Sequence, residues 1–450
     1  MRNRKILDIA AVLTVALLAR LAFLVIFGGL DNEIHDSLGD QYIYLDIAGN
    51  LADGDGFSVS TDIWIADPGE PTSIMPPLYP VVLGALFGVT GESLVAARLL
   101  NLVLSASLAV LAYLIAGRLV TRRWALFSGM LAALYPPLVM YVRPLMSEIL
   151  FFPLVALLVY CTFFLIEERP SRWIWPVWGS VAGLAILTRT EGGILAGALL
   201  AFVVGYRWYR SRDISLGRPL IAIIACGLVL TPYALYNLDA HGSPSPLPNA
   251  KWKLWDHTWW ADARTSPEWE GVLLPERTVV PDWDAKTEAE RDAYLSDMAI
   301  EFVRENPQTY LKQRAKRLFW SYPLVPVEEL RTPQPPDGRN LSATSLDDVV
   351  RYSTTVEKIR VWSFRLAFLG AAAGLIVGLR RRETLLLATV VAWNVLHSAL
   401  FVGSERLRLQ IDLILIVLTV STLAYAWGAI AARSSSKRWD AGEAPASATG

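Results

Sequence analysis

The chain has little charge and almost no cysteine. Asp, Glu, Lys and Arg make up 18% of its 450 residues and the mean hydropathy is +0.38, whereas soluble proteins carry about 25% charged residues. This composition argues against an ordinary soluble enzyme and excludes an intrinsically disordered chain. The two cysteines, Cys161 and Cys226, lie in long apolar runs, which excludes a disulfide framework and a cysteine-rich metal site. Because 41 basic residues balance 42 acidic ones, nothing supports a nucleic-acid partner.

Three motifs of common enzymes are also missing. The chain has no G-x-x-x-x-G-K-S/T phosphate loop, no H-E-x-x-H zinc pair and no G-x-S-x-G nucleophile elbow. ATP-driven transport and serine hydrolysis therefore lose their usual support.

Long hydrophobic runs are abundant. A helix that crosses a bilayer needs about 20 mainly apolar residues, and ten stretches reach or approach that length: 9–30, 94–117, 124–141, 146–166, 173–187, 193–206, 220–236, 361–379, 384–402 and 407–430. They predict an all-α polytopic membrane protein with about 10 transmembrane helices, interfacial helices and an external cap segment of mixed or mainly helical structure. The run at 9–30 is longer than a signal-peptide core and lacks an A-x-A exit, which indicates a retained first helix.

The basic residues predict which side of the membrane each connection occupies. Short cytoplasmic loops are enriched in Lys and Arg, and every second connection carries them: Arg2, Arg4 and Lys5; Arg118, Arg122 and Arg123; Arg169 and Arg172; Arg207, Arg210, Arg212 and Arg218; Arg380, Arg381 and Arg382; Arg433, Lys437 and Arg438. The connection at 31–75 has ten acids and no Lys or Arg, as expected outside. We predict cytoplasmic termini, an extracytoplasmic site, and a bacterial or archaeal plasma (inner) membrane.

The same alternation sets the domain organisation. Counting the short apolar segment 77–88 as a span would invert every later loop, so we predict an interfacial or re-entrant helix within 77–90. We expect an N-terminal membrane module (1–236) with an acidic first external loop (31–76), an external cap (237–360), C-terminal membrane helices (361–432) and a disordered cytoplasmic tail (433–450). A basic amphipathic helix ending in 310–320 would lie either on the outer leaflet or over the core of the cap.

The first external loop carries the first candidate site residues. Residues 41–51 read as a short helix with Asp40 at its N-cap, and Tyr42 and Asp46 follow. Asp40 is then either a helix cap alone or a carboxylate at the membrane surface that acts as a general base or holds a divalent cation.

Charged residues recur at the later external turns. Glu148 lies at or below the interface, where an ionised carboxylate needs a partner such as Arg143 or Arg98. A tight turn brings Arg189 close to Glu191. The last external turn adds the remaining candidates: His397, Glu405, Arg406 and Arg408. Arginine suits phosphate binding because its planar fork of donors matches phosphate oxygens, although a structural salt bridge explains the acid–arginine pairs equally well.

Together these motifs resemble the GT-C superfamily of membrane glycosyltransferases, in the branch of protein O-mannosyltransferases and aminoarabinose transferases. The resemblance rests on six segments: Gly39-Asp40-Gln41-Tyr42, Pro76-Pro77-Leu78-Tyr79-Pro80, Arg98-Leu99-Leu100-Asn101, Tyr135-Pro136-Pro137 with Ser147-Glu148, Leu187-Thr188-Arg189-Thr190-Glu191, and Glu405-Arg406-Leu407-Arg408. It implies a polyprenyl-phosphate-linked sugar donor, a protein, lipid or polysaccharide acceptor, and direct displacement with inversion.

The resemblance also implies roles for individual residues. Asp40 matches the first-loop carboxylate that deprotonates or orients the acceptor, and external arginines, above all Arg406 and Arg189, would bind the lipid phosphate. Relatives often place an acid after the loop Asp, where this chain has Gln41. Metal dependence therefore stays open: a divalent cation is possible, and we name no required cofactor and no metal ligand.

Three other functions stay open. A lipid-pyrophosphate-linked oligosaccharide ligase or polymerase shares the carrier and the membrane face. A secondary transporter fits less well, because polar residues gather on one face rather than near the midplane. A non-catalytic scaffold would have an Asp40 that can be replaced without effect on cellular glycans.

Overall fold

The computed structural model describes residues 2–28, 30, 39–212, 217–247, 249, 251–263, 275–322, 324, 354–400 and 405–440. Within these residues the chain is almost entirely helical and contains no β-strand, only three isolated β-bridges in the loop at 58–71. The predicted all-α membrane architecture is confirmed.

Eight of the described helices are long and apolar enough to cross a membrane. They are α1 (Arg2–Phe23, continued by the π-helix Leu24–Gly28), α4 (Leu94–Ala116), α7 (Glu148–Leu165), α9 (Glu191–Ser211), α10 (Gly217–His241), α17 (Thr354–Gly378), α18 (Arg382–Leu400) and α19 (Glu405–Asp440). Each coincides with one of the ten expected stretches.

The other two expected spans are shorter than a membrane-crossing helix. The stretch 124–141 forms α5 (Arg122–Leu134) and α6 (Pro136–Met140), separated at Tyr135 because a residue before proline disfavours the helical conformation. The stretch 173–187 forms α8 (Ile174–Thr188), whose 15 residues extend only about 22 Å. At the C-terminus α19 continues to Asp440, so residues 433–440 are helical rather than a disordered tail, and 441–450 lie outside the described residues.

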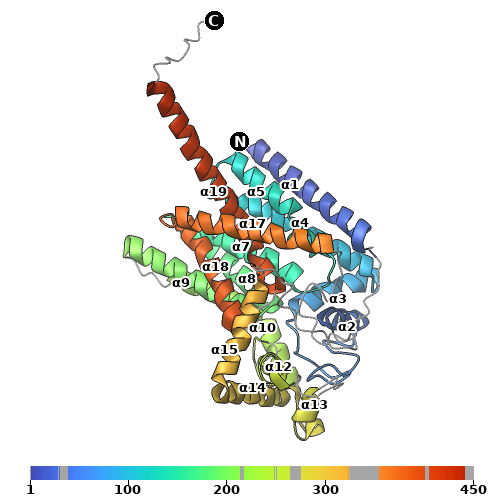
Figure 1. Cartoon of the computed structure of the whole chain (residues 1–450). Coiled ribbons are helices and arrows are strands. Elements are labelled where there is room, and N and C mark those ends of the chain that lie inside the picture. Colours follow the sequence, from blue (N-terminus) through green and yellow to red (C-terminus); the bar gives the residue numbers. More distant parts are fainter. Residues whose placement is uncertain are drawn as a thin grey trace.

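The short apolar segment after the first loop forms a helix of its own. It is α3 (Leu78–Thr90), which packs against α2 (Asp40–Asp53). Gly84 permits this contact, because a Cβ there would lie 2.9 Å from the Cβ of Leu51. The pair α2–α3 lies beside the membrane helices rather than among them (Figure 1).

The described part of the cap consists of four short helical segments and two longer helices. It contains α11 (Trp252–Asp256), α12 (Trp259–Ala263), α13 (Pro275–Val279), the 3-10 turn Trp283–Ala285, α14 (Glu288–Glu305) and α15 (Pro307–Ser321). A capping box of Thr287 and Glu290 fixes the start of α14. In Figure 1 the start of α1 and the end of α19 lie at one end of the molecule, and α12–α14 lie at the other. The helix over 310–320 is α15, which packs on α18 through a hydrogen bond from the Tyr310 hydroxyl to the Leu400 carbonyl, 2.8 Å.

The close packing of α8 on α10 can be tested at Gly179. A Cβ at this position would overlap the backbone carbonyl of Ala222, which cannot rotate away. We expect Gly179→Ala to lower the free energy of unfolding by about 1–3 kcal/mol, measured as thermal denaturation of the purified protein in detergent. The control is Gly197→Ala in α9, where an added Cβ meets no atom within 4 Å. Equal denaturation midpoints for the two variants would contradict the packing.

Candidate active site

Four helices begin at one place on the cap side of the membrane helices. Asp40 is the first residue of α2, Glu148 of α7 and Glu191 of α9, and Arg406 is the second residue of α19. The N-terminus of a helix carries partial positive charge, which stabilises a carboxylate in its first turn. The three carboxyl groups thus lie at three helix N-termini, where negative charge is favourable.

Asp40 is not the N-cap residue of α2. Gly39 occupies the N-cap position of α2, and no side-chain cap hydrogen bond is present there. The interpretation of Asp40 as only a helix cap is therefore wrong, and its carboxylate is available for another contact.

The three carboxylates and two arginines form a continuous chain of ion pairs. Arg406 places Nη2 2.8 Å from Asp40 Oδ2 and Nε 2.8 Å from Glu148 Oε1. Arg189 places Nη1 2.8 Å from the same Glu148 oxygen and Nε 2.6 Å from Glu191 Oε1. The order is Asp40, Arg406, Glu148, Arg189, Glu191, so each arginine lies between two acids. We call these five residues the ion-pair chain. The sequence suggested Arg143 or Arg98 as the partner of Glu148. In the structure, Glu148 instead pairs with both arginines of the ion-pair chain.

Uncharged neighbours fix the ion-pair chain in place. The Ser147 hydroxyl accepts from Arg189 Nη1 at 3.2 Å and from the Tyr44 hydroxyl at 2.9 Å. Gln41, at the position where relatives often carry an acid, accepts from the backbone N–H of Leu145 at 3.0 Å. Gln41 therefore binds the turn before α7 to α2.

Burial differs along the ion-pair chain. The Glu148 side chain is 1% exposed, whereas Asp40 is 21% exposed. Burial alone would raise the pKa of Asp40, but the positive charges of Arg406, Lys253 and Arg189 outweigh it and hold that pKa below its usual value. Asp40 is thus an ionised carboxylate at the more exposed end of the ion-pair chain.

Lys253 is the site residue that the sequence analysis missed. It lies in α11, in the cap, with Nζ 5.5 Å from the ring centroid of Trp64 and 5.9 Å from that of Trp252. Burial lowers its pKa. Among the residues that the structure describes, Lys253 forms no ion pair. The one signal in the sequence is its place in an aromatic-rich segment of the cap, Trp252 to Trp260.

The aromatic neighbour of Lys253 is conformationally strained. Trp64 has φ +50°, a left-handed conformation that bulky residues rarely adopt. Its ring lies 4.7 Å from that of Trp252, measured between centroids. Strain of this kind persists only where the surrounding structure over-determines it.

The first-loop residues other than Asp40 lie outside the ion-pair chain. Asp46 accepts from the backbone N–H of Ser60 at 2.8 Å, so it ties the loop to α2. Tyr42 is half-buried against the hydrophobic core. Arg143, from the turn before α7, is half-buried and makes no ion pair with the described residues.

The last group of predicted residues separates in space. Arg408 is 1% exposed, with Nε 3.3 Å from Asp412 Oδ1 and its guanidinium 3.6 Å from the Phe364 ring centroid. His397 is buried beside Trp393 and interacts electrostatically with Glu191 and Arg189. Glu405 begins α19, but its side chain lies outside the described residues.

The donor set does not fit a divalent cation. Asp40, Glu148 and Glu191 each contact a guanidinium, which already neutralises them and repels a cation. Within the described part of the chain, no group of three or more His, Cys, Asp or Glu side chains is arranged to hold a metal ion.

Comparison with known proteins gave one family and several structures. The model of the family described as dolichyl-phosphate-mannose-protein mannosyltransferase matches residues 75–233. The archaeal oligosaccharyltransferase AglB from Archaeoglobus fulgidus, in complex with an inhibitory peptide and a dolichol-phosphate, is 14% identical over 98% of this chain and 52% of that chain, with a TM-score of 0.54. The apo form from the same organism gives 14% identity, 98% and 53% coverage and a TM-score of 0.56.

The similarity to the archaeal structures concerns only part of their length. The chain spans about half the length of the archaeal oligosaccharyltransferase chains, and at this identity the match concerns the fold. ArnT from Cupriavidus metallidurans bound to undecaprenyl phosphate is 14% identical over 93% of this chain and 77% of that chain, but its TM-score of 0.42 is too low to support an argument. No curated protein matches the chain by sequence.

The central role of Glu148 can be tested by removing its charge. In Glu148→Gln the guanidinium groups of Arg189 and Arg406 would face each other without the buried carboxylate between them. We expect a loss of about 3–5 kcal/mol in the free energy of unfolding, measured by thermal and chemical denaturation in detergent.

The matched control is Glu168→Gln, which removes an acid from an exposed pair with Arg210. Water screens such a pair, so the denaturation midpoint should hardly move. If the two variants were equally stable, the ion-pair chain would not be the constraint described here.

Proposed function

The chain has the membrane fold of the GT-C glycosyltransferases that its sequence resembles, and we propose that it transfers a sugar from a polyprenyl-phosphate-linked donor to an acceptor at the extracytoplasmic face. One observation carries this proposal: the ion-pair chain ends in an ionised, partly exposed carboxylate, Asp40, on which the positive charges of Arg406 and Lys253 act. A base beside cations is what a displacement with an anionic leaving group requires.

The proposed reaction is one displacement at the anomeric carbon. Asp40 accepts the proton of an acceptor hydroxyl while the hydroxyl oxygen forms the new bond to that carbon. The bond between the anomeric carbon and the phosphate oxygen breaks, and its electron pair leaves with the polyprenyl phosphate. The sugar is transferred with inversion, and no further reactant is needed.

The cations have two roles in the proposed reaction: one orients the base, and the others stabilise the leaving phosphate. Arg406 is held between Asp40 and Glu148 and therefore orients the base and keeps it ionised. Lys253 forms no ion pair within the described residues, so its charge is available to the phosphate, on which negative charge grows as the bond breaks. Arg189 contributes the same field from further along the ion-pair chain.

The membrane supplies the donor. Large apolar side chains are exposed along α1, α10 and α17, where membrane lipids would cover them, including Leu18, Ile26, Leu228, Leu366 and Ile376. A polyprenyl chain in the outer leaflet of a plasma membrane would present its phosphate at the height where the four helices begin. The acceptor would be a protein, lipid or polysaccharide hydroxyl arriving from the extracytoplasmic side.

A second candidate function is a ligase for pyrophosphate-linked oligosaccharides. It is favoured by the similarity in fold to an archaeal oligosaccharyltransferase. The two functions differ in the lipid that accumulates when the enzyme is inactive.

Replacing the proposed base tests both functions. In Asp40→Asn the rate of transfer should fall by about 100- to 10,000-fold, the usual contribution of a general base. Mass spectrometry of membrane lipids, at matched protein levels, should show a polyprenyl monophosphate sugar that accumulates only in this variant. Asp53→Asn, at the exposed end of α2, is the control and should accumulate nothing. A pyrophosphate-linked oligosaccharide would establish the ligase, and an unchanged lipid profile would refute both functions.

The pH dependence follows from the ionisation of Asp40. A base must be deprotonated, and because the pKa of Asp40 is held below its ordinary value, the acidic fall in the rate of transfer should lie at lower pH than an ordinary Asp would give. Arg406→Gln removes the largest of the cationic effects, so the pKa of Asp40 rises and the acidic fall in rate moves to higher pH. Initial rates in liposomes from pH 4 to 8 measure this shift. An unchanged acidic limb would show that the titrating base is another group.

A further inference from the structure

The helix α14 presents three charged residues on one face to the rest of the cap. Glu288, Arg291 and Asp292 are three and four residues apart, so they share a face of the helix. All three are buried. None of them belongs to the ion-pair chain, and charges are rarely buried without partners.

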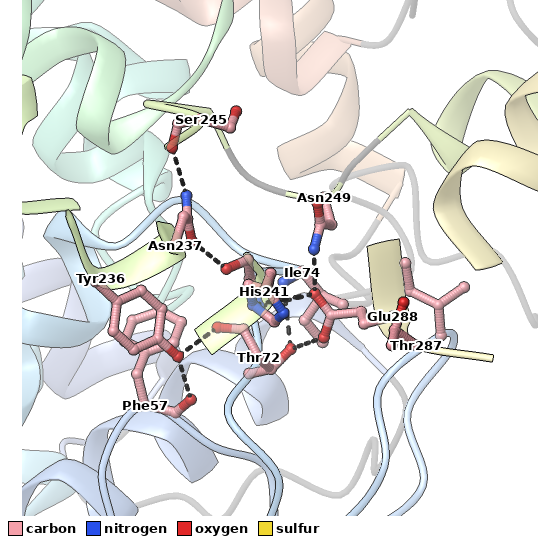
Figure 2. A network of polar contacts seen from close by, with 12 residues as sticks. Phe57, Thr72, Ile74, Tyr236, Asn237, His241, Ser245, Asn249, Thr287 and Glu288 are labelled. Atoms are coloured by element: carbon pink, nitrogen blue, oxygen red, sulfur yellow. Dashed lines mark hydrogen bonds and ion pairs between the residues drawn. The ribbon is translucent and has the colours of Figure 1, made fainter. Parts of the chain in front are cut away.

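Glu288 joins two segments that are far apart in the sequence. Its Oε2 accepts from the Thr72 hydroxyl at 2.5 Å, and its Oε1 accepts from the Ser73 backbone N–H at 2.9 Å and from Asn249 Nδ2 at 2.8 Å. Figure 2 shows the carboxyl group between Thr72 and Asn249, with His241 beside it. The backbone N–H of Asn249 also donates to the Ser73 carbonyl at 2.8 Å. The first external loop and the segment that leads into α11 therefore meet at this carboxyl group.

Asp292 extends the same connection to the start of α11. Its Oδ1 accepts from the backbone N–H of Trp252 at 2.8 Å. Trp252 directly precedes Lys253 in the chain, and its ring is one of the two against which the Lys253 ammonium packs. The position of Lys253 therefore depends on α14.

Arg291 fixes the other aromatic neighbour of Lys253. It donates to the Ile65 carbonyl at 3.0 Å and to Asp67 Oδ2 at 2.6 Å. Ile65 directly follows Trp64 in the chain. The two tryptophans against which Lys253 packs are thus both held by α14.

We propose that Glu288 is a positioning residue for the active site, which holds Lys253 against Trp64 and Trp252 by joining the first external loop to the segment before α11. The placement of Lys253 is independent of the reaction, while its effect on transfer rests on the function proposed above. Glu288 acts through Lys253 and does not itself touch the reacting atoms.

The contacts of Glu288 require a hydrogen-bonding group and not a charge. Burial raises the pKa of Glu288 to about 7, in surroundings that include Asp292 on its own helix and His241 Nε2 at 3.9 Å. A glutamine has the shape of the protonated acid. Its oxygen can accept from Ser73 and Asn249, and its amide can donate to the Thr72 hydroxyl.

Hydrogen exchange of the full-length protein in nanodiscs tests the placement without any substrate. In Glu288→Ala the backbone amides of 249–256 and 66–76 should exchange faster by on the order of tenfold, because buried donors lose their acceptor. Glu288→Gln should exchange like the wild type. The control is Glu301→Ala, on the exposed side of the same helix, which should not change either segment. Unchanged exchange in Glu288→Ala, or equal loss of protection throughout the protein, would overturn the proposal.

A double-mutant cycle then tests whether Glu288 acts through Lys253. The rate of transfer is measured in membranes that contain the lipid accumulated by Asp40→Asn. Glu288→Ala should slow transfer in the wild-type background and have little further effect in Lys253→Gln, because coupled residues are not additive. Additive losses would overturn the positioning role. If Asp40→Asn accumulates no lipid while Glu288→Ala still exposes 249–256, the proposed function fails and the placement of Lys253 by Glu288 stands.

Discussion

The structure depends on the pairing of charges that are largely removed from water. An isolated carboxylate or guanidinium in such a place costs several kcal/mol or more, so none of the ion-pair chain can be buried without the others. Its members come from the starts of α2, α7, α9 and α19 and from the turn before α9, and 366 positions separate Asp40 from Arg406. The pairing therefore brings four helix starts to one place. Replacing buried ion pairs with apolar side chains is neutral for stability in many proteins, which fits the chemical role that we propose for these charges.

The ion-pair chain is asymmetric, and the asymmetry assigns the roles. Glu148, in the middle, pairs with both arginines and is 1% exposed, so it holds Arg189 and Arg406 in position. Asp40, at one end, has a single arginine partner and is 21% exposed, so a substrate can reach it. The cap contributes Lys253 at this end, a cation from an element that the membrane helices do not include. In the proposed function, the membrane module thus provides the base and its orientation, and the cap provides a further positive charge.

The sequence predicted the membrane helices and named all five residues of the ion-pair chain as candidates, but of the pairings within that chain it suggested only that of Arg189 with Glu191. An apolar run of membrane length has one stable conformation in lipid, and an acid or arginine at the end of such a run must find a partner. The break at Tyr135 was not predicted, because it depends on the restriction that Pro136 places on the residue before it and not on hydropathy. Lys253 and Glu288 were missed for a different reason. Neither lies at the end of a membrane-length apolar run, and their contacts join residues far apart in the sequence, as in the bond between Thr72 and Glu288, 216 positions apart.

Arg406 and Arg408 belong to one sequence motif but lie on different faces of α19. The sequence suggests both as phosphate ligands. However, residues two positions apart in an α-helix point in directions that differ by about 200° around the helix axis. When Arg406 faces Asp40, Arg408 must therefore face the opposite side, where it packs on Phe364 of α17 and pairs with Asp412 one turn later. The Tyr135 hydroxyl, at the break between α5 and α6, donates to the same Asp412 at 3.1 Å. Arg406 thus pairs with the proposed base, and Arg408 anchors α19 to the helices that hold Arg406 in place.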